Sequence, residues 1–308
     1  LEKHKWESSS LSTRVTYSSV VAGLELPEDI VNEDEKEWTL LDYNMTDKRE
    51  QTLAFARVLG FILADGSISR YTNERSTEII SSSVSIGTMF DAKIFVSDIK
   101  LLTGKEPTIY DNKTDDVKGN TFKVTIPVSL VKQIMKLRGI MVGKRTHQPF
   151  ILPDFVFDPA CPLSVVREFL GGLFGGDGTS PGLSVAHPSF SPVCIGWSTV
   201  EKYKSDMVET MNKLIGLLSR LGLSFHLAVQ RLARVRSEMK PTDIIENPRW
   251  EYTITGLSSA NLSFAKTIGF RYCSDKNNRL TVAASYQRYS DNARKQHIEI
   301  VEKASDMK

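Results

Sequence analysis

The sequence predicts an α+β fold made of two related halves. Two glycine-rich apolar runs of the same form occur 112 residues apart, and the same order of helices and strands is predicted after each. The chain has 308 residues, enough for two domains. A repeat this long indicates a duplicated domain rather than a solenoid. The predicted divisions are an N-terminal extension at 1–49, a first half at 50–155 and a second half at 156–308.

The composition is that of a folded protein, 41% hydrophobic and 25% charged. No apolar run reaches the roughly 18 residues that a membrane span needs, so we expect no membrane segment. The three cysteines, Cys161, Cys194 and Cys273, lie far apart and form no CxxC pair. They predict free thiols in an intracellular, reducing compartment rather than a disulfide framework or a zinc site.

Charge is distributed unevenly along the chain. The formal net charge is only +2. Residues 25–38 carry seven acidic residues and one basic residue, a net of −6, which leaves +8 for the rest. The basic surface typical of a nucleic-acid-binding protein is therefore partly hidden in the total by one acidic segment within the predicted extension.

The two apolar runs are VLGFILADG at 58–66 and LGGLFGGDG at 170–178. Small residues recur four apart in both, which places them on one face of a helix. Glycine costs roughly 1 kcal/mol against alanine inside a helix, so several together need a packing reason. Small side chains let two helix backbones approach closely, and we expect the two motif helices to pack against each other. The small pairs are Gly60 with Ala64, Gly171 with Gly175, and Gly172 with Gly176.

Each run ends in Asp-Gly. Gly66 and Gly178 are predicted C-terminal stops, which places Asp65 and Asp177 in the last turn of their helices. A carboxylate at a helix C-terminus is unfavourable by about 0.3–1 kcal/mol, and two such ends side by side repel further. A cation between them would remove this cost. Because the ligands are oxygens, the sequence predicts a divalent metal site that favours Mg²⁺.

Period-2 alternation and helical spacing predict the remaining elements, in the order αββαββα in each half. In the first half, strands at 67–75 and 77–86 follow the motif helix, then a helix at 88–103, strands at 107–110 and 120–126, and a helix at 128–137. In the second half, the motif helix at 165–177 is followed by strands at 182–186 and 193–198, a helix at 202–221, strands at 224–232 and 250–255, and a helix at 258–268. A final charged helix at about 282–304 has no counterpart in the first half.

The two motifs resemble those of the LAGLIDADG homing endonucleases, and the resemblance extends loosely over residues 50–300. It implies two pseudo-symmetric αββαββα halves that pack through the paired motif helices and form a β-saddle over DNA. The implied ligands of two or three Mg²⁺ ions are Asp65, Asp177, Gly66 and Gly178. The acidic residue that the family carries two positions earlier is absent here, but it is not the metal ligand, so the expectation of activity stands.

The resemblance implies a site-specific endonuclease that acts as a monomer on double-stranded DNA. It would make a staggered, metal-dependent cut at a long asymmetric target, with Asp65 and Asp177 catalytic. Members associated with inteins carry a lysine in the loop after the last helix of each half, and Lys144 and Lys276 match it. These lysines indicate the intein-associated branch and are the other two predicted catalytic residues. The alternative is that both are exposed loop lysines.

The polar faces of the strands are the predicted DNA-binding surface, because β-ribbons can enter the major groove. Any one of these residues could instead belong to an ordinary solvated strand face. The candidates are Ser67, Ser69, Arg70, Tyr71, Asn73 and Arg75 in the first half, and Thr179, Ser180, His187, Trp197, Gln230, Arg231, Arg234 and Arg236 in the second.

Two other classes of function stay open on the sequence. One is a nucleic-acid-binding protein on the same fold that does not cut, either an intron maturase acting on RNA or a degenerate endonuclease. The other is a protein without a nucleic-acid partner, in which the glycine-rich helices form only a structural interface. The presence of both Asp65 and Asp177 favours the endonuclease.

Overall fold

The structure is a computed structural model that describes residues 46–72, 78–112, 121–145, 148–159, 161–183, 189–233, 248–257 and 259–306. The acidic segment at 25–38 lies outside these ranges. So do five predicted DNA-contacting residues: Asn73, Arg75, His187, Arg234 and Arg236.

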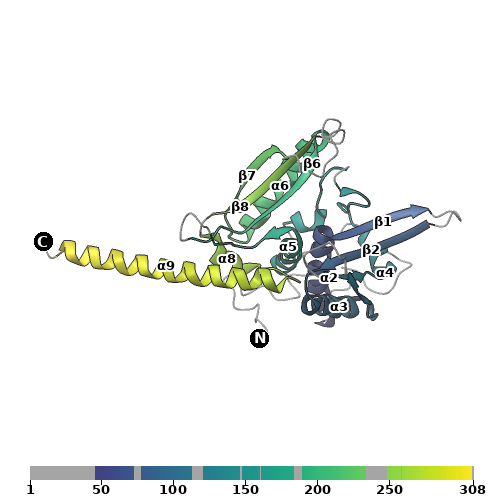
Figure 1. Cartoon of the computed structure of the whole chain (residues 1–308), viewed down its shortest axis with the longest axis horizontal. Coiled ribbons are helices and arrows are strands. Elements are labelled where there is room, and N and C mark those ends of the chain that lie inside the picture. Colours follow the sequence, from purple (N-terminus) through teal and green to yellow (C-terminus); the bar gives the residue numbers. More distant parts are fainter. Residues whose placement is uncertain are drawn as a thin grey trace.

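The first half has the predicted order of elements (Figure 1). It consists of α2 (Thr46–Asp65), β1 (Gly66–Thr72), β2 (Glu78–Ile86), α3 (Met89–Thr103), β3 (Ile109–Asn112), β4 (Thr121–Thr125) and α4 (Val128–Ile134). Its four strands form an antiparallel sheet in the order β1-β2-β4-β3. Helix α2 begins four residues before the predicted boundary at residue 50, which itself stays a prediction.

The second half repeats the topology after a short 3-10 helix at Asp154–Phe157. It consists of α5 (Leu163–Asp177), β5 (Gly178–Thr179), β6 (Cys194–Val200), a 3-10 turn at Glu201–Tyr203, α6 (Lys204–Arg220), β7 (Phe225–Leu232), β8 (Arg249–Gly256), α8 (Ala260–Thr267) and α9 (Ser274–Asp306). Its sheet order, β5-β6-β8-β7, matches that of the first half strand for strand. The predicted α+β class and the αββαββα order are confirmed.

Most predicted boundaries differ from the observed ones by a few residues, and two elements of the second half begin elsewhere than predicted. The first strand of the second half is β5 at Gly178–Thr179, directly after the motif helix, rather than at 182–186. Within the described part of that range, Leu183 makes only an isolated bridge with Phe190. The final helix begins at Ser274, so the segment predicted as a loop after α8 contains the first turn of α9.

Alternation along the strands separates a helix-covered face from an open face in each sheet. In β1, Ile68 is buried, whereas Ser67 and Ser69 lie on the opposite face. In the second sheet, Ile195 and Ile254 are buried neighbours on β6 and β8, and α6 packs against that side. The open face of each sheet is the one opposite these buried residues.

The two motif helices pack against each other at the centre of the molecule, as predicted (Figure 1). A methyl group added at Gly60 would lie 2.1 Å from the Phe169 carbonyl oxygen, and one at Gly172 would lie 2.0 Å from the Arg57 carbonyl oxygen. Glycine is therefore required at both positions, because each receives the backbone of the partner helix.

The other glycines of α5 face a different neighbour. A methyl group at Gly171 would meet the Arg271 side chain at 2.9 Å, and one at Gly175 would meet the Arg271 carbonyl oxygen at 1.9 Å. The Arg271 amide also donates to the Gly171 carbonyl over 2.9 Å. The prediction that these two glycines belong to the helix pair was therefore wrong; they admit the chain segment that leads into α9.

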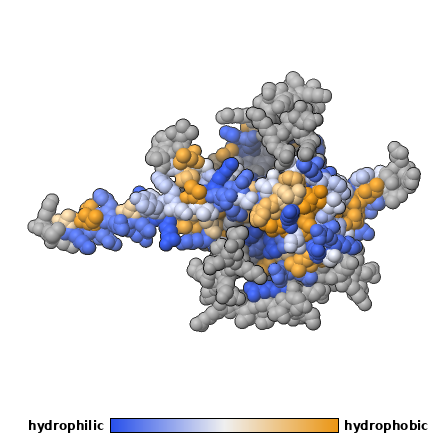
Figure 2. Space-filling view, turned by 60° about the horizontal axis from the view of Figure 1, so that its bottom comes forward, coloured by the Kyte–Doolittle hydropathy of each residue, from blue (hydrophilic) through white to orange (hydrophobic). Residues whose placement is uncertain are grey.

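Helix α9 has 33 residues and projects away from the two halves (Figure 1). Its projecting part is mostly hydrophilic, with a separate hydrophobic patch towards its end (Figure 2). Ile298, Ile300 and Val301, near the C-terminal end of α9, have exposed side chains. None of the helices in the described ranges combines the length and apolar composition needed to cross a membrane.

Candidate metal centre at the paired helix ends

Asp65 and Asp177 are the last residues of α2 and α5, as predicted. The glycines that follow are needed for a reason other than the one predicted. Gly178 has an extended backbone (φ −70°), not the left-handed conformation of a glycine stop. A methyl group at Gly66 or Gly178 would lie 2.4 Å from a carbonyl oxygen one turn back, so glycine lets each strand leave its helix without a clash.

The two carboxyl groups differ in exposure, because Asp65 is exposed and Asp177 is half-buried. Burial raises the pKa of Asp65, and the nearby cations of Lys276 and Arg145 oppose that change. Burial also raises the pKa of Asp177; Arg145 and a hydrogen bond from Trp197 oppose it, while the charge of Asp65 adds to it. The charge of Asp65 therefore acts on Asp177 across the helix pair, and the role of both aspartates as metal ligands stays a prediction.

Lys276 reaches this centre from the first turn of α9. Its ammonium donates to the Gly175 carbonyl over 2.7 Å and to the Gly176 carbonyl. Burial lowers the pKa of Lys276, while Cys273, Asp65 and Asp177 raise it. The lysine therefore satisfies carbonyl groups that the end of α5 leaves unpaired, and it places a cation next to both aspartates.

In the first half, Arg145 rather than Lys144 makes the corresponding contact. Arg145 donates to the Leu63 carbonyl, and its guanidinium lies 3.9 Å from Asp177 Oδ2. Leu63 precedes Asp65 by two residues, just as Gly175 precedes Asp177. Lys144 is exposed, and within the described ranges no contact of its ammonium brings it to the aspartates. Its catalytic role stays a prediction.

Sequence reasoning missed Arg145 although it adjoins the predicted lysine. The loop is fixed by Gly143, which adopts a positive φ of 85° and donates its amide to the Ile68 carbonyl over 2.8 Å. Which of two consecutive basic residues turns inward depends on this loop geometry. The sequence did indicate a basic residue here, since Lys144 and Arg145 are adjacent in the loop, but it did not indicate which of the two reaches the aspartates.

Trp197 contacts the centre itself, although it was predicted as a DNA contact. Its indole Nε1 donates to Asp177 Oδ2 over 2.5 Å, and its ring packs against Phe150 with centroids 4.7 Å apart. Trp197 lies on the same face of β6 as the buried Ile195, which is the helix-covered face of the sheet and not the open one. Trp197 therefore orients Asp177.

The predicted DNA-contacting residues of the first half divide between the two faces of β1. Ser67, Ser69 and Tyr71 lie on the open face. Arg70 alternates with them, falls on the face of Ile68, and forms an ion pair with Glu78. Three of these four described residues are thus on the surface that the prediction needs.

In the second half, Thr179 is exposed at the start of the sheet, whereas Ser180 is buried. Arg231 is paired with Glu251 across β7 and β8 on the open face, 3.2 Å apart. Gln230 is opposite the buried Tyr252, and therefore belongs to the helix-covered face. A direct role in binding DNA stays a prediction for all of these residues.

The donor groups at the centre suit a hard divalent cation. Asp65 and Asp177 supply carboxylate oxygens, and helix-end carbonyl groups lie beside them. Oxygen ligands of this kind are those that Mg²⁺ and Ca²⁺ prefer. Within the described ranges, no cluster of three or more histidine, cysteine, aspartate or glutamate side chains offers a competing site.

No family model matches the chain. Curated relatives include the tRNA-splicing ligase RtcB of Methanopyrus kandleri, 23% identical over 284 residues, which are 88% of this chain and 26% of that protein. Another is the replication factor C small subunit of Methanocaldococcus jannaschii, 29% identical over 138 residues, which are 43% of this chain and 7% of that protein. The chain thus spans about a quarter or less of the length of these relatives.

Solved structures with a similar arrangement include the homing endonuclease I-DmoI in complex with DNA and Mn. It has a TM-score of 0.43 at 11% identity and covers 71% of this chain and 97% of its own. The homing endonuclease I-WcaI bound to its DNA recognition sequence has a TM-score of 0.43 at 11% identity, covering 83% of this chain and 98% of its own.

Proposed function

We propose that this protein is a metal-dependent endonuclease of the LAGLIDADG homing type that cuts double-stranded DNA. The observation that carries the proposal is the pair of aspartates, Asp65 and Asp177, at the adjoining ends of two closely packed helices. Each of these helices leads directly into a four-stranded sheet with an open polar face. This arrangement suits a duplex that lies across both sheets, with its phosphates at the helix ends.

In this proposal Asp65 and Asp177 hold the divalent cations, and the resemblance implies two or three Mg²⁺ ions. When bound, such a cation would stabilise the charge that develops on a phosphodiester during hydrolysis. Trp197 fixes the orientation of Asp177 through its indole N–H. Lys276 and Arg145 bring positive charge from opposite halves to the region where negative charge would develop.

The open faces of the two sheets differ, which supports an asymmetric target. In the first sheet, β1 and β2 pair serine with serine, at Ser67 with Ser83 and at Ser69 with Ser81. The open face of the second sheet carries Arg231. Lys123 lies on the open face of the first sheet as well, opposite Ser85, so each half-site would meet a basic group, and the difference between the half-sites would lie in the paired serines of the first sheet. A single chain holds both halves, so the proposed enzyme acts as a monomer.

The intein-associated branch is the finer proposal. One stretch of this chain is similar to a part of an RNA ligase and also to a part of a replication factor. These two proteins differ in function, and in each the similar part is a small fraction of the length. A segment shared in this way is expected of an inserted element, which supports the proposal.

A cleavage screen against a large library of duplex DNA tests the function, with Mg²⁺ in one arm and EDTA in the other. We expect staggered double-strand cuts at one long asymmetric sequence, abolished by EDTA. The variants Asp65→Asn and Asp177→Asn should each slow the cut by about 10³-fold or more, because a metal ligand contributes several kcal/mol to the transition state. Duplex that is retained selectively but not cut would show a binding protein instead.

A further inference from the structure

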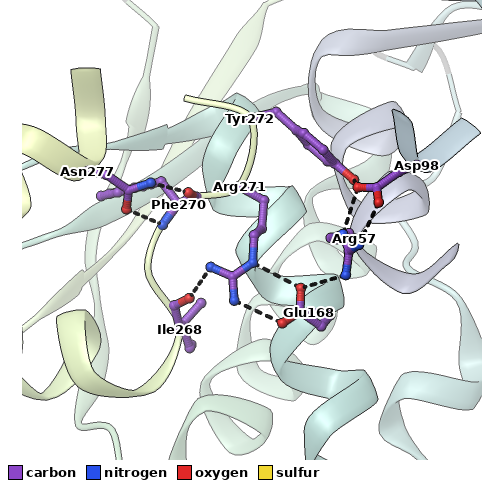
Figure 3. Close-up of polar contacts among 8 residues, drawn as sticks. All are labelled: Arg57, Asp98, Glu168, Ile268, Phe270, Arg271, Tyr272 and Asn277. Carbon is purple, nitrogen blue, oxygen red and sulfur yellow. Dashed lines mark hydrogen bonds and ion pairs between the residues drawn. The ribbon is translucent and has the colours of Figure 1, made fainter. Parts of the chain in front are cut away.

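The segment at 268–277, which joins α8 to α9, is held by buried polar contacts from both halves (Figure 3). Arg271 forms a bidentate ion pair with Glu168 of α5, with both N–O distances at 2.9 Å. The Tyr272 hydroxyl donates to Asp98 of α3 over 2.6 Å, and Asp98 in turn pairs with Arg57 of α2. The segment therefore runs across the junction between the halves.

Asp91, in the first turn of α3, makes the contact nearest to α9. It is 4% exposed. Its carboxylate accepts from the Ser274 amide over 3.0 Å and from the Ser274 hydroxyl over 2.9 Å. The Thr88 hydroxyl donates to the same carboxylate over 2.7 Å. Asp91 belongs to the first half, whereas Ser274 begins the last helix of the second.

A carboxylate at this position stabilises the start of α9. The first amides of a helix have no partner within it, and negative charge near them is favourable. Lys276 is two residues beyond Ser274, so the contact with Asp91 fixes the turn from which its ammonium extends to Gly175 and Gly176. Asn277 supports the same turn by bonding the Phe270 backbone through both of its side-chain ends.

We propose that Asp91 is a positioning residue for Lys276, through which the first half sets the place of the basic group that the second half contributes. This rests on the proposed nuclease function. It implies that the loss of Asp91 impairs only the cut that Lys276 serves, because Arg145 reaches the centre from a different loop. The other ties of the segment, at Glu168 and Asp98, keep it folded in the variant.

The first arm of the experiment measures cleavage of each DNA strand separately, with the two strands labelled differently. We expect Asp91→Ala to slow one strand by about 10–100-fold, the effect of displacing a catalytic group by about 1 Å. It should be the same strand that Lys276→Met slows, and the double variant should lose no more than Lys276→Met alone. Equal slowing of both strands, or additive losses in the double variant, would show that Asp91 has only a structural role.

Thr88→Ala is the matched control. Thr88 caps α3 by accepting from the Asp91 amide over 3.1 Å, so its loss weakens the same helix end. The variant also loses the hydrogen bond from the Thr88 hydroxyl to the Asp91 carboxylate, but it keeps the contacts between Asp91 and Ser274, which do not involve Thr88. We expect Thr88→Ala to lower the melting temperature without favouring either strand. A strand bias as large as that of Asp91→Ala would overturn the proposal.

The second arm does not depend on cleavage. Acetic anhydride labelling followed by peptide mass spectrometry measures how accessible the Lys276 amine is, with exposed Lys100 as the internal reference. We expect several-fold faster labelling of Lys276 in Asp91→Ala and no change in Thr88→Ala. Unchanged labelling in Asp91→Ala refutes the positioning role. If the wild-type protein cuts no duplex, the proposed function fails, while the labelling still decides the role of Asp91.

Discussion

The ends of α2 and α5 carry the same Asp-Gly sequence but are supported in different ways. Around the end of α5, Gly171 admits the Arg271 side chain and Gly175 admits its backbone, and Lys276 then binds two carbonyl groups. The corresponding positions of α2 are the buried leucines Leu59 and Leu63, and a single arginine reaches that end from a loop. The two helix ends have the same motif sequence, but different contacts hold the basic side chain at each of them.

The difference has a physical consequence. Lys276 depends on a segment that crosses the junction of the halves and is tied by an ion pair and hydrogen bonds to two helices, α3 and α5. Arg145 depends on a loop anchored by Gly143 to β1 of its own half. A disturbance of the junction should thus affect the two basic groups unequally. Repetition of the motif predicts that the two halves have similar sites, but it does not predict that the basic group of each site is held equally firmly.

The largest expected effect on stability comes from breaking the junction at Glu168. Glu168 is 3% exposed and pairs with Arg271 at 2.9 Å and with Arg57 at 3.6 Å. Glu168→Ala removes the carboxylate that Arg271 binds through two nitrogens and leaves Arg57 with Asp98 alone, which costs about 3–5 kcal/mol of unfolding free energy. Urea denaturation measures this, and Glu106→Ala, which breaks an exposed pair with Lys100, should change the midpoint little.

Glu168 should also make the stability of the junction depend on pH on the acid side. Burial alone would raise the pKa of Glu168, but Arg271, Arg57 and Arg167 outweigh it and hold the pKa below the ordinary value of 4.5. A lowered folded-state pKa contributes stability above pH 4.5 that is lost as the pH falls through the folded-state value. Glu168→Gln should therefore show a flatter acid side in its stability profile; a profile parallel to that of the wild type would contradict the assigned charge.

Removing each basic group in turn sharpens the comparison of the two centres. Lys276→Met and Arg145→Met should each slow the cut of one strand by about 10²-fold, and the two variants should affect opposite strands. Strand-resolved single-turnover kinetics measure this. Lys144→Met is the matched control, since Lys144 is the exposed neighbour of Arg145. If Lys144→Met slowed the cut more than Arg145→Met, the prediction that Lys144 is catalytic would be right, and the role inferred for Arg145 would be wrong.

The order of elements could be predicted because it depends on local patterns. Alternation at Ile68 and helical spacing up to Gly104 follow from burial on one face, and Gly104 ends α3 with a left-handed φ of 69°. The aspartates were also predictable, because Asp-Gly ended both apolar runs. These features depend on residues close together in sequence, and such residues determine helices, strands and helix ends.

The parts that could not be predicted depend on contacts between distant residues. Arg271 contacts Gly171 and Glu168 more than 95 residues away, and nothing in its neighbourhood indicates this. Trp197 lies in a strand whose alternation is clear, but its bond to Asp177 requires the packing of β6 beside α5. The face on which Arg70 lies could not be predicted either, because polar residues occupy both faces near the end of β1.

A smaller effect tests why α5 needs glycines where α2 has leucines. Gly175→Ala brings a methyl group to within 1.9 Å of the Arg271 carbonyl oxygen, and we expect a loss of about 1–3 kcal/mol despite the better helix propensity of alanine. Gly216→Ala in α6 is the control, since a methyl group there meets nothing within 4 Å. It should raise the unfolding free energy by about 0.4–1 kcal/mol. Equal effects of the two changes on thermal stability would mean that the close approach at Gly175 does not matter.

The smallest effect concerns the hydroxyl of Tyr272, which is buried between Phe61 and Phe95 and donates to Asp98. Tyr272→Phe keeps the ring packing and leaves Asp98 its pair with Arg57, so the loss of unfolding free energy should be only about 1 kcal/mol.

Burial, together with the negative charge of Asp98, raises the pKa of Tyr272 well above 10.0. A raised folded-state pKa contributes stability that is complete below pH 10 and is lost as the pH rises further. The stability difference between the wild type and Tyr272→Phe should therefore be constant at neutral pH and shrink above pH 10. A difference that grows with pH would mean that the phenol does not donate to Asp98, and that the junction is held by the ion pairs alone.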